Sequence, residues 1–279
     1  MAIHTSIINT DGQTNMFAFY GEAGSGKTTA ATELFGLENT LYFDCENGAK
    51  FIEGLSVWSP SDDPKDRPFK WEHFEEAAKD VVKNKFNAIA IDNFFNLAMW
   101  LEKYVCDIMS EESKDGRHYK SLGEIGFGKG EARCKKEIFR IFNYFVQNNI
   151  GVVLICHKKT DYKTIKNKNT KESEQKTGDT LNLPKWAYEV AIPNCDYVFY
   201  FFKDGFGEFR IKLKGDETSV AKDRTGTLPE EIPNNPVILK KLVMDSSEKM
   251  RDRVRKAKDN LRKSWEDEAS NYLKELGLD

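Results

Sequence analysis

The sequence predicts an α/β fold: a mostly parallel central sheet with helices on both faces, then a C-terminal β-hairpin and a helical extension. Three observations predict it. Short apolar runs alternate along the chain with amphipathic helical stretches, as in sheets built from strand–helix–strand units. The run at 151–156 is almost wholly apolar, which is typical of a strand covered on both faces. A glycine-rich turn joins the first run to the first helix.

The expected elements of the first half follow in chain order. The apolar run 17–20 predicts a buried strand, and the segment 27–35 predicts a helix that a glycine closes. The run 40–44 predicts a second strand. Apolar residues at helical spacing predict a helix over 70–85. The run 88–92 predicts a third strand, which ends in an acidic residue.

The second half first continues this pattern and then changes. Apolar residues at helical spacing predict a helix over 138–147, directly before the apolar strand. The segments 197–202 and 209–213 flank a Lys-Asp-Gly-Phe-Gly turn and predict a β-hairpin. Two long segments, the glycine-rich 110–130 and the lysine-rich 158–183, are expected to be loops, and loops of this length are usually functional or disordered.

From about residue 245 the chain is charged and helical, so we expect a core over residues 1–244 and a charged amphipathic extension over 245–279. Apolar side chains recur in the extension at spacings of three, four and seven. They are Met250, Val254, Ala257, Leu261, Trp265 and Tyr272. Such a stripe packs either against the chain's own core or against a partner, and the pattern leaves both alternatives open.

Composition limits the classes of function. The chain has 279 residues, with 39% apolar, 12% aromatic and 31% charged residues, which is enough for one sizeable core. No apolar run approaches the ~18 residues of a membrane span, and no secretory signal is visible. The five cysteines are scattered and form no Cys-x-x-Cys pair, so we expect reduced thiols, no zinc site and a cytoplasmic location. With a net charge of -3, any site for a polyanion must be local.

A complete phosphate-binding loop (P-loop, Walker A) of the form G-x-x-x-x-G-K-[ST] follows the first strand. It comprises Gly21, Glu22, Ala23, Gly24, Ser25, Gly26, Lys27 and Thr28. Glycines let the backbone curl so that successive N–H groups point at phosphate oxygens, and the helix N-terminus adds partial positive charge. Lys27 is expected to reach the β- and γ-phosphates, and the Thr28 hydroxyl to ligate Mg²⁺. The loop therefore predicts that the chain binds a nucleoside triphosphate together with magnesium.

Carboxylates end two of the predicted strands. Asp92 closes the run 88–92, where it is expected to hold Mg²⁺ opposite Thr28. Glu46 follows the second strand and is the candidate that orients or deprotonates the attacking water. Asp44 competes for the same role. Because carboxyl ends of parallel strands collect at one edge of a sheet, we expect all three near the phosphates.

His157 ends the apolar strand and is expected at the same edge, where it either contacts the γ-phosphate or caps the strand. The segment 158–176 that follows holds seven lysines against three acidic residues. Lysines at this density either bind a phosphate backbone without reading sequence or belong to a solvated loop. The candidate DNA-binding residues are Lys158, Lys159, Lys163, Lys166 and Lys168. Tyr162, Tyr119 and Phe127 are candidates for stacking on bases.

Lys222 and Arg224 stand one residue apart after the predicted hairpin. On an extended segment such a pair projects the same way. The two cations therefore suit either a γ-phosphate or an ordinary charged surface.

The order of these motifs resembles the RecA-like ATPase core. More narrowly, it resembles the short phage-encoded RecA-like ATPases, including Sak-type single-strand annealing proteins, which often carry a Lys-Asp-Arg-x-Gly segment near the domain end. The resemblance covers roughly residues 16–244. It is carried by the segments 21–28, 44–46, 88–92, 152–157 and 221–226.

The resemblance implies a role for several residues. Glu46 matches the water-activating glutamate, and His157 takes the place of a glutamine that senses the γ-phosphate. Lys222 and Arg224 match cations that reach into the nucleotide of a neighbouring subunit. The two long segments match loops that line the path of DNA. RecA's N-terminal oligomerising segment and folded C-terminal domain have no counterpart here, so we do not expect a RecA-type filament.

The expected function is an ATP- and Mg²⁺-dependent ATPase that hydrolyses slowly, is stimulated by DNA and binds single-stranded DNA in phage recombination or strand annealing. Expected partners are single-stranded DNA, a single-stranded-DNA-binding protein and further copies of the chain, with no membrane. One alternative is a P-loop ATPase that acts on protein partners in DNA packaging, partition or replication. Another is a nucleotide-dependent scaffold with negligible hydrolysis.

Overall fold

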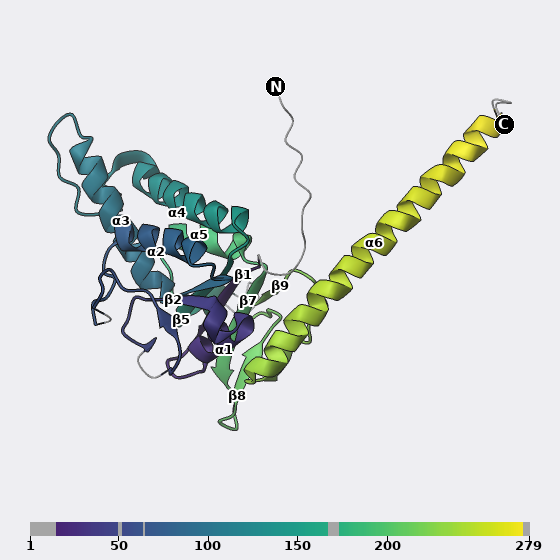
Figure 1. Cartoon of the computed structure of the whole chain (residues 1–279), viewed down its shortest axis with the longest axis horizontal. Coiled ribbons are helices and arrows are strands. Elements are labelled where there is room, and N and C mark those ends of the chain that lie inside the picture. Colours follow the sequence, from purple (N-terminus) through teal and green to yellow (C-terminus); the bar gives the residue numbers. More distant parts are fainter. Residues whose placement is uncertain (1–14, 50–51, 64, 167–172, 276–279) are drawn as a thin grey trace.

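A mixed, mostly parallel sheet runs through the body of the computed structural model, which describes residues 15–49, 52–63, 65–166 and 173–275 (Figure 1). The strand order is β10-β8-β7-β1-β5-β4-β2-β3, with β6 paired to β5 and β9 paired to β7. The strands are β1 (Met16–Gly21), β2 (Thr40–Asp44), β3 (Ser56–Val57), β4 (Ala88–Asp92), β5 (Gly151–Lys166), β6 (Ser173–Leu181), β7 (Tyr197–Lys203), β8 (Phe209–Lys212), β9 (Lys222–Asp223) and β10 (Glu231–Pro233). The predicted α/β class with a mostly parallel sheet is confirmed.

Helices cover both faces of the sheet. They are α1 (Lys27–Phe35), α2 (Trp71–Lys83), α3 (Phe94–Glu111), α4 (Lys129–Gln147), α5 (Lys185–Asn194) and α6 (Pro236–Glu275), with 3-10 turns η1 (Leu37–Asn39), η3 (Leu122–Glu124) and η4 (Gly126–Gly128). Successive side chains of a strand point to opposite faces, so each central strand contributes to two apolar layers. In β1, Ala18 packs with α2–α5 on one face, and Phe17 and Phe19 pack with α1 and the start of α6 on the other.

Most predicted elements of the core occur at or near their predicted positions, but some were missed. The helix at 138–147 begins nine residues earlier, at Lys129. Two buried helices, α3 and α5, were not anticipated because their apolar residues merge with neighbouring apolar or loop-like stretches. The helix of the extension begins at Pro236 and continues without interruption through residue 245, where the sequence pattern had suggested a boundary.

The segment 158–183 is not the loop that its polar composition predicted. Strand β5 continues through Lys166 and turns back as β6, so the two strands form an antiparallel ribbon beyond the main sheet. Its register runs from the pair Lys158 and Leu181 to the pair Lys166 and Ser173. Backbone pairing between the strands overrides the weak strand propensity of lysine-rich sequence. The segment 110–130 does remain largely irregular, with η3 and η4 inside it.

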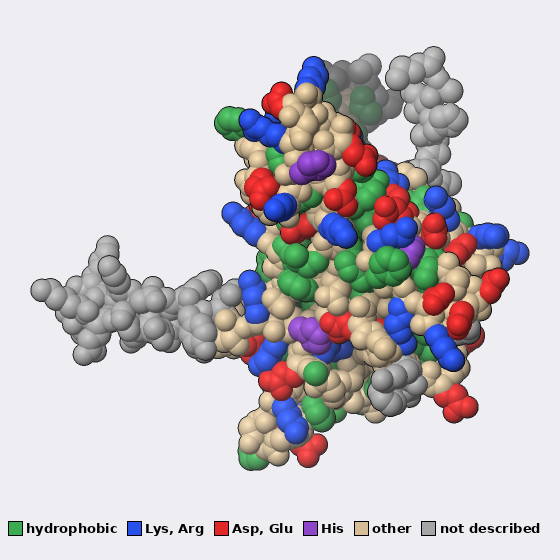
Figure 2. Space-filling view, turned by 90° about the vertical axis from the view of Figure 1, so that its left-hand side faces the viewer, with side chains coloured by type: hydrophobic (Ala, Val, Ile, Leu, Met, Phe, Trp, Pro, Cys, Tyr) green, Lys and Arg blue, Asp and Glu red, His purple; other side chains and the backbone are tan. Residues whose placement is uncertain are grey.

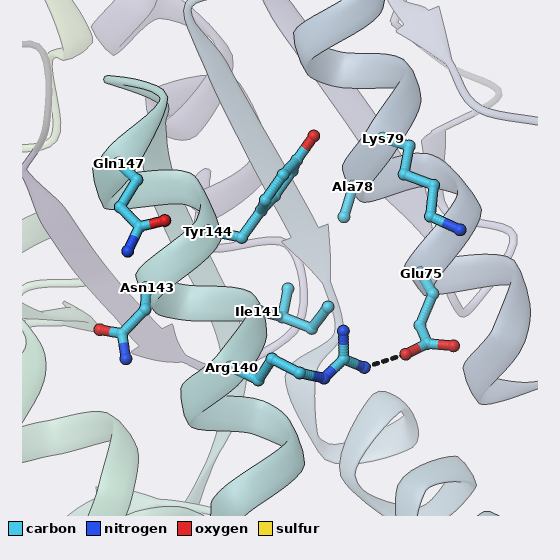
Figure 3. Close-up of a pocket in the computed structure, with 8 residues that line it drawn as sticks. All are labelled: Glu75, Ala78, Lys79, Arg140, Ile141, Asn143, Tyr144 and Gln147. Atoms are coloured by element: carbon cyan, nitrogen blue, oxygen red, sulfur yellow. Dashed lines mark hydrogen bonds and ion pairs between the residues drawn. The ribbon is translucent and has the colours of Figure 1, made fainter.

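A groove of about 380 Å³ lies between α2 and α4 (Figure 3). Ala78 and Ile141 contribute apolar surface, and Arg140 forms an ion pair with Glu75 at one end. None of the residues that line this groove belongs to the P-loop or to the ends of β2, β4 and β5. The groove is therefore separate from the candidate nucleotide site.

Among the described helices, none is both long enough and apolar enough to pass through a lipid bilayer. The longest, α6, is polar along most of its length.

Candidate nucleotide site

The candidate residues converge on the edge of the sheet where β1, β5, β4 and β2 end. In the parallel register, Gly21 at the end of β1 lies opposite His157 in β5. Asp92 at the end of β4 lies opposite Asp44 at the end of β2. The expectation that the strand ends gather the P-loop, both aspartates and the histidine is met because the four strands are parallel neighbours.

The P-loop curls between β1 and α1 in the conformation that its glycines permit. Gly24 and Gly26 have positive φ angles of 72° and 82°, which favour glycine. Gly26 also allows a close approach, because a Cβ atom there would lie 2.7 Å from the amide nitrogen of Asn234. That amide donates to the carbonyl oxygen of Ser25 at 2.9 Å, so the segment before α6 holds the P-loop in place.

Lys27 is buried within this loop. Its Nζ donates to the carbonyl oxygen of Glu22 at 2.6 Å and of Gly21 at 3.2 Å, and lies 3.3 Å from Oγ of Ser25. Burial lowers the pKa of Lys27 from its ordinary value, while nearby Asp92 opposes this. The ammonium group thus lies within the curl of the loop backbone, and phosphate oxygens are acceptors that can replace the carbonyls.

The Thr28 hydroxyl donates to Oδ2 of Asp92 at 2.9 Å, and the Tyr42 hydroxyl donates to the same oxygen. Thr28 is the second residue of α1, directly after Lys27 of the P-loop, so a hydroxyl and a carboxylate oxygen lie together beside the loop. These oxygen donors fit Mg²⁺, which takes few protein ligands and keeps waters and phosphate oxygens in its coordination sphere. Among the described residues, no cluster of three or more His, Cys, Asp or Glu is arranged to hold a metal ion.

Glu46 is held by two neighbours at the same edge. Both of its carboxylate oxygens lie within hydrogen-bonding distance of Nε2 of His157, at 3.1 and 3.2 Å. The side-chain amide of Asn93, the residue after β4, donates to Oε1 of Glu46. The Glu46 side chain is 31% exposed, so it is oriented by protein groups and still open to solvent. A carboxylate in this state can accept a proton from water.

Asp44 is in a different environment. It is 1% exposed, and its two oxygens accept backbone N–H groups of Glu46, Gly48 and Ala49 at 3.0 to 3.2 Å. It also accepts a hydrogen bond from Nη1 of Arg67 at 2.8 Å. A carboxylate with four donors has no free lone pair directed at solvent, so the geometry favours Glu46 over Asp44 for the catalytic role.

Lys158 links the P-loop to the base of the β5–β6 ribbon. Its Nζ lies 3.0 Å from the Glu22 carboxylate and 3.6 Å from Asp179 in β6. Burial raises the pKa of Asp179, but hydrogen bonds from Tyr200 and Thr160 and the charge of Lys158 outweigh it and lower the pKa overall. The residue proposed to contact DNA is thus engaged, in this state, with two carboxylates beside the nucleotide site.

The remaining candidate lysines lie on the ribbon. The backbone register places Lys163 opposite Lys176. Lys159 precedes them in β5, and Lys166 ends the strand. Lys168 lies outside the described residues.

Lys222 and Arg224 are not part of this edge. Strand β9 pairs with Tyr197 and Val198, at the beginning of β7, whereas Gly21 pairs with Phe201 near its end. Four residues of strand, ~13 Å, separate the two positions. In this chain the two cations therefore lie at the opposite edge from the P-loop, and the same-side projection that the sequence suggested does not bring them to its phosphates.

Both cations have partners at that edge. Nζ of Lys222 contacts the carbonyl oxygens of Ile192, Pro193 and Cys195 at 3.2, 3.1 and 2.6 Å, at the C-terminal end of α5. Arg224 pairs with Asp196 at 2.8 Å. Lysine near a helix C-terminus satisfies carbonyls that have no partner in the helix. Within one chain, the geometry gives Lys222 a capping role.

The two aromatic candidates in the segment 110–130 differ. Tyr119 is partly buried against the core, whereas the Phe127 side chain is fully exposed and has a positive φ angle of 61°. Tyr162 lies in the part of β5 whose side chains are not described. Of the two, the structure leaves Phe127 available to a partner.

Sequence reasoning missed three residues that shape the site: Tyr42, Asn93 and Asn234. Asn93 had a visible signal, because it directly follows the aspartate that ends β4. Tyr42 lies inside an apolar strand, and Asn234 is 208 positions from Gly26 in the sequence. The sequence alone therefore gives no signal that either residue belongs to the site.

Charged side chains of both signs are mixed on the face of the molecule that Figure 2 shows. On the face shown in Figure 2, lysine and arginine side chains alternate with aspartate and glutamate, and apolar patches between them are small. No broad single-sign field covers this face. With a net charge of -3 the chain as a whole is not basic, which agrees with a local site for any anionic partner.

A comparison with known proteins identifies the family of this chain. A family model described as an AAA domain matches residues 13–225. Among solved structures, 292 chains match. One is described as the crystal structure of the RadB recombinase: it shares 14% sequence identity, the alignment covers 80% of this chain and 88% of that chain, and the TM-score is 0.39. No curated protein matches. At this identity and TM-score the RadB likeness carries no argument about function.

Proposed function

Because the chain belongs to the AAA-domain family of P-loop ATPases, we propose that it is an ATP- and Mg²⁺-dependent ATPase that binds single-stranded DNA in recombination or strand annealing. The observation that carries the proposal is the meeting of P-loop, Asp92, Glu46 and His157 at one edge, directly at the base of a lysine-rich ribbon. The phage setting is carried by the sequence resemblance alone.

Nucleotide binding rests on the P-loop. The backbone N–H groups of the loop and the N-terminus of α1 bind the phosphates, and the Lys27 ammonium exchanges its carbonyl partners for phosphate oxygens. Thr28 and Asp92 would hold Mg²⁺ through their hydroxyl and carboxylate oxygens. Bound magnesium supplies charge neutralisation at the phosphates. Tyr42 keeps the Asp92 carboxylate turned toward Thr28.

Water activation rests on Glu46. The carboxylate accepts a proton from the attacking water, while His157 and Asn93 keep its oxygens directed at the phosphate edge. A negative group that is fixed by two neighbours loses little entropy on reaching the reactive geometry. His157, which contacts Glu46, directly precedes Lys158 in β5, where the ribbon begins. A change in the position of Glu46 can therefore reach Lys158 through one neighbouring residue.

DNA binding rests on the ribbon. Its lysines make point-charge contacts to phosphates and read no bases, so binding should tolerate any sequence. The register places two of these lysines, Lys163 and Lys176, at opposed positions of the ribbon. Release of Lys158 from Glu22 when nucleotide enters the P-loop would add a cation to this surface, which makes binding responsive to ATP.

The test is the ATPase rate of the full chain with and without single-stranded DNA, over a series of salt concentrations. We expect Mg²⁺-dependent turnover that single-stranded DNA stimulates. The stimulation should decrease as the salt concentration rises, because salt weakens the binding of DNA. The Lys27→Ala variant, which removes charge and little core volume, should fold and lose turnover. Unchanged turnover in folded Lys27→Ala would reject the P-loop assignment. Turnover indifferent to DNA at every salt concentration would favour the alternative, an ATPase that acts on protein partners.

A further inference from the structure

The long helix α6 is packed against the body only at its beginning. Leu239 and Val243 are buried in the layer that also holds α1, and Ser246 lies 3.1 Å from the hydroxyl of Tyr197. From Glu248 to Lys274 every side chain that the structure describes is exposed. Figure 1 shows this part of α6 extending away from the body. About 27 residues of helix, ~40 Å, therefore have no covering layer.

This free part of α6 carries apolar side chains on one stripe. Leu261, Trp265 and Tyr272 are 51%, 61% and 62% exposed, at spacings of four and seven residues, with Ala257 and Ala269 on the same stripe. Most helical stability in proteins comes from packing of such a stripe, and a charged helix without it is marginal in water. An exposed tryptophan between leucine and tyrosine marks an interaction surface.

The two halves of this helix carry opposite charge. Residues 249–263 contain eight lysines and arginines against two aspartates, whereas residues 264–275 contain four acidic residues against one lysine. The whole chain is nearly balanced, at -3. Charges that flank an apolar stripe determine which helices pair and in which orientation. Two copies in parallel would place like charges together; two antiparallel copies would place the basic half of each against the acidic half of the other.

We propose that the free part of α6 pairs with the same helix of a second copy of this chain, in antiparallel orientation and centred near Lys263. Residues at equal distance from the centre then face each other. Leu261 meets Trp265 of the partner subunit, and Ala257 meets the partner's Ala269, so a large layer alternates with a small one. Tyr272 meets position 254, which the sequence fills with valine.

The antiparallel pairing determines where the bodies of the two copies lie. The bodies attach at the beginning of α6, so an antiparallel pair holds two ATPase bodies at opposite ends of a helical bar of ~40 Å. The contact uses none of the residues of the nucleotide site. Its existence is therefore independent of the proposed function, and a failed test of one leaves the other standing.

The competing occupant is a nucleic acid. A groove lined by Gly226, Thr227, Lys249, Asp252, Arg253 and Lys256 lies where α6 leaves the body, and cations predominate in it. The acidic half of the helix would repel a phosphate backbone, and the apolar stripe would stay uncovered. Pairing with a second copy covers both features, so we favour it and leave nucleic acid as an outcome of the test.

The first experiment measures the mass of the full chain in solution by light scattering at low and moderate salt. We expect twice the 32.0 kDa of one chain, falling toward one chain as the salt concentration rises. The double variant Leu261→Ala, Trp265→Ala should be a folded monomer. The matched control Val146→Ala, Phe206→Ala removes exposed apolar surface from the body and should stay dimeric. A monomeric wild-type chain at all concentrations would overturn the proposal.

The second experiment determines the orientation by disulfide formation. Ala257→Cys alone should not cross-link, because the two copies lie ~18 Å apart along the pair, and neither should Ala269→Cys alone. Mixing the two variants should give a cross-linked dimer under mild oxidation. The wild-type chain, whose described cysteines are all buried or partly buried, serves as control. Cross-linking of either variant with itself would mean parallel pairing and overturn the proposal. A monomer whose tryptophan fluorescence responds to added DNA, with the response lost in Trp265→Ala, would overturn it in favour of nucleic acid.

Discussion

Two carboxylates two residues apart, Asp44 and Glu46, end up with different chemistry. Asp44 is buried and accepts four donors, three from the backbone of the following turn and one from Arg67. Glu46 is partly exposed and accepts from Asn93 while it contacts His157. From the sequence, Glu46 is the candidate for the catalytic role and Asp44, at the end of the same strand, is its competitor. Their hydrogen-bond partners differ: the Asp44 carboxylate is saturated by protein donors, whereas the Glu46 carboxylate is still open to solvent and suits the proposed role of base.

The Glu46→Gln variant should keep its affinity for ATP and lose turnover by ~10²–10⁴-fold, because it preserves shape and removes the proton acceptor. Asp44→Asn should instead lower the free energy of unfolding by about 1–3 kcal/mol, since it weakens hydrogen bonds to a charged, buried group. Steady-state turnover, nucleotide binding and urea denaturation of both variants check this. A stable Asp44→Asn variant without turnover would mean that Asp44 is the base.

Lys222 presents a similar choice between chemistry and architecture. The Lys222→Met variant keeps the aliphatic stem and loses the donor at the end of α5, so we expect unfolding to become about 1–2 kcal/mol easier. Arg224→Ala, at a side chain that is 56% exposed, should cost less. Both should bind ATP as the wild type does. The role in a neighbouring subunit stays a prediction: if it holds, mixing either variant with Lys27→Ala should restore partial turnover.

Among the elements, β5 connects the chemistry of the core to the outer surface. Its first six residues are the apolar strand between β1 and β4, and the rest forms the ribbon with β6. His157 and Lys158 lie at the transition, one contacting Glu46 and the other Glu22. A continuous strand transmits a displacement more directly than a flexible loop does. The ribbon therefore suits a nucleotide-dependent surface, although composition alone had predicted a loop.

The ribbon lysines should determine the salt dependence of DNA binding. If about four lysines contact phosphates, log K should fall with log salt at a slope near -3, from ~0.7 per contact on single strands. Replacing Lys163, Lys166 and Lys168 with alanine should flatten the slope by roughly 2, weaken all sequences alike and leave ATP binding intact. The control triple variant replaces the exposed helix lysines Lys83, Lys103 and Lys136. An equal loss in both variants would place the DNA site elsewhere.

At the scale of the whole molecule, α6 belongs to two environments. Its first turns complete the core beside α1, and Asn234 just before it holds the P-loop at Ser25. Its remaining length projects into solvent with an exposed apolar stripe. One helix thus joins the nucleotide site to the surface that we propose for self-association.

Truncation at two positions separates these environments. A chain ending at Ser246 should remain folded, bind ATP and be monomeric, because it keeps Leu239, Val243 and the Ser246 contact. A chain ending at Asn235 should be strongly destabilised, since each lost buried side chain contributes about 1.5–3 kcal/mol. Circular dichroism and light scattering distinguish the two. Unfolding of the longer truncation would show that the free part of α6 packs on the body after all.

The sequence by itself determined the sheet, the P-loop and the strand-end acids, because apolar periodicity and glycine chemistry act over a few residues. It placed α1 and β2 at their observed limits and brought Asp92 to the phosphate edge. Only the tertiary structure decided which acid is saturated, where Lys222 lies and that the lysine-rich segment is a ribbon. These depend on partners far away in the chain: a strand forms when another strand pairs with it, and a carboxylate is free or saturated according to which donors the fold brings to it.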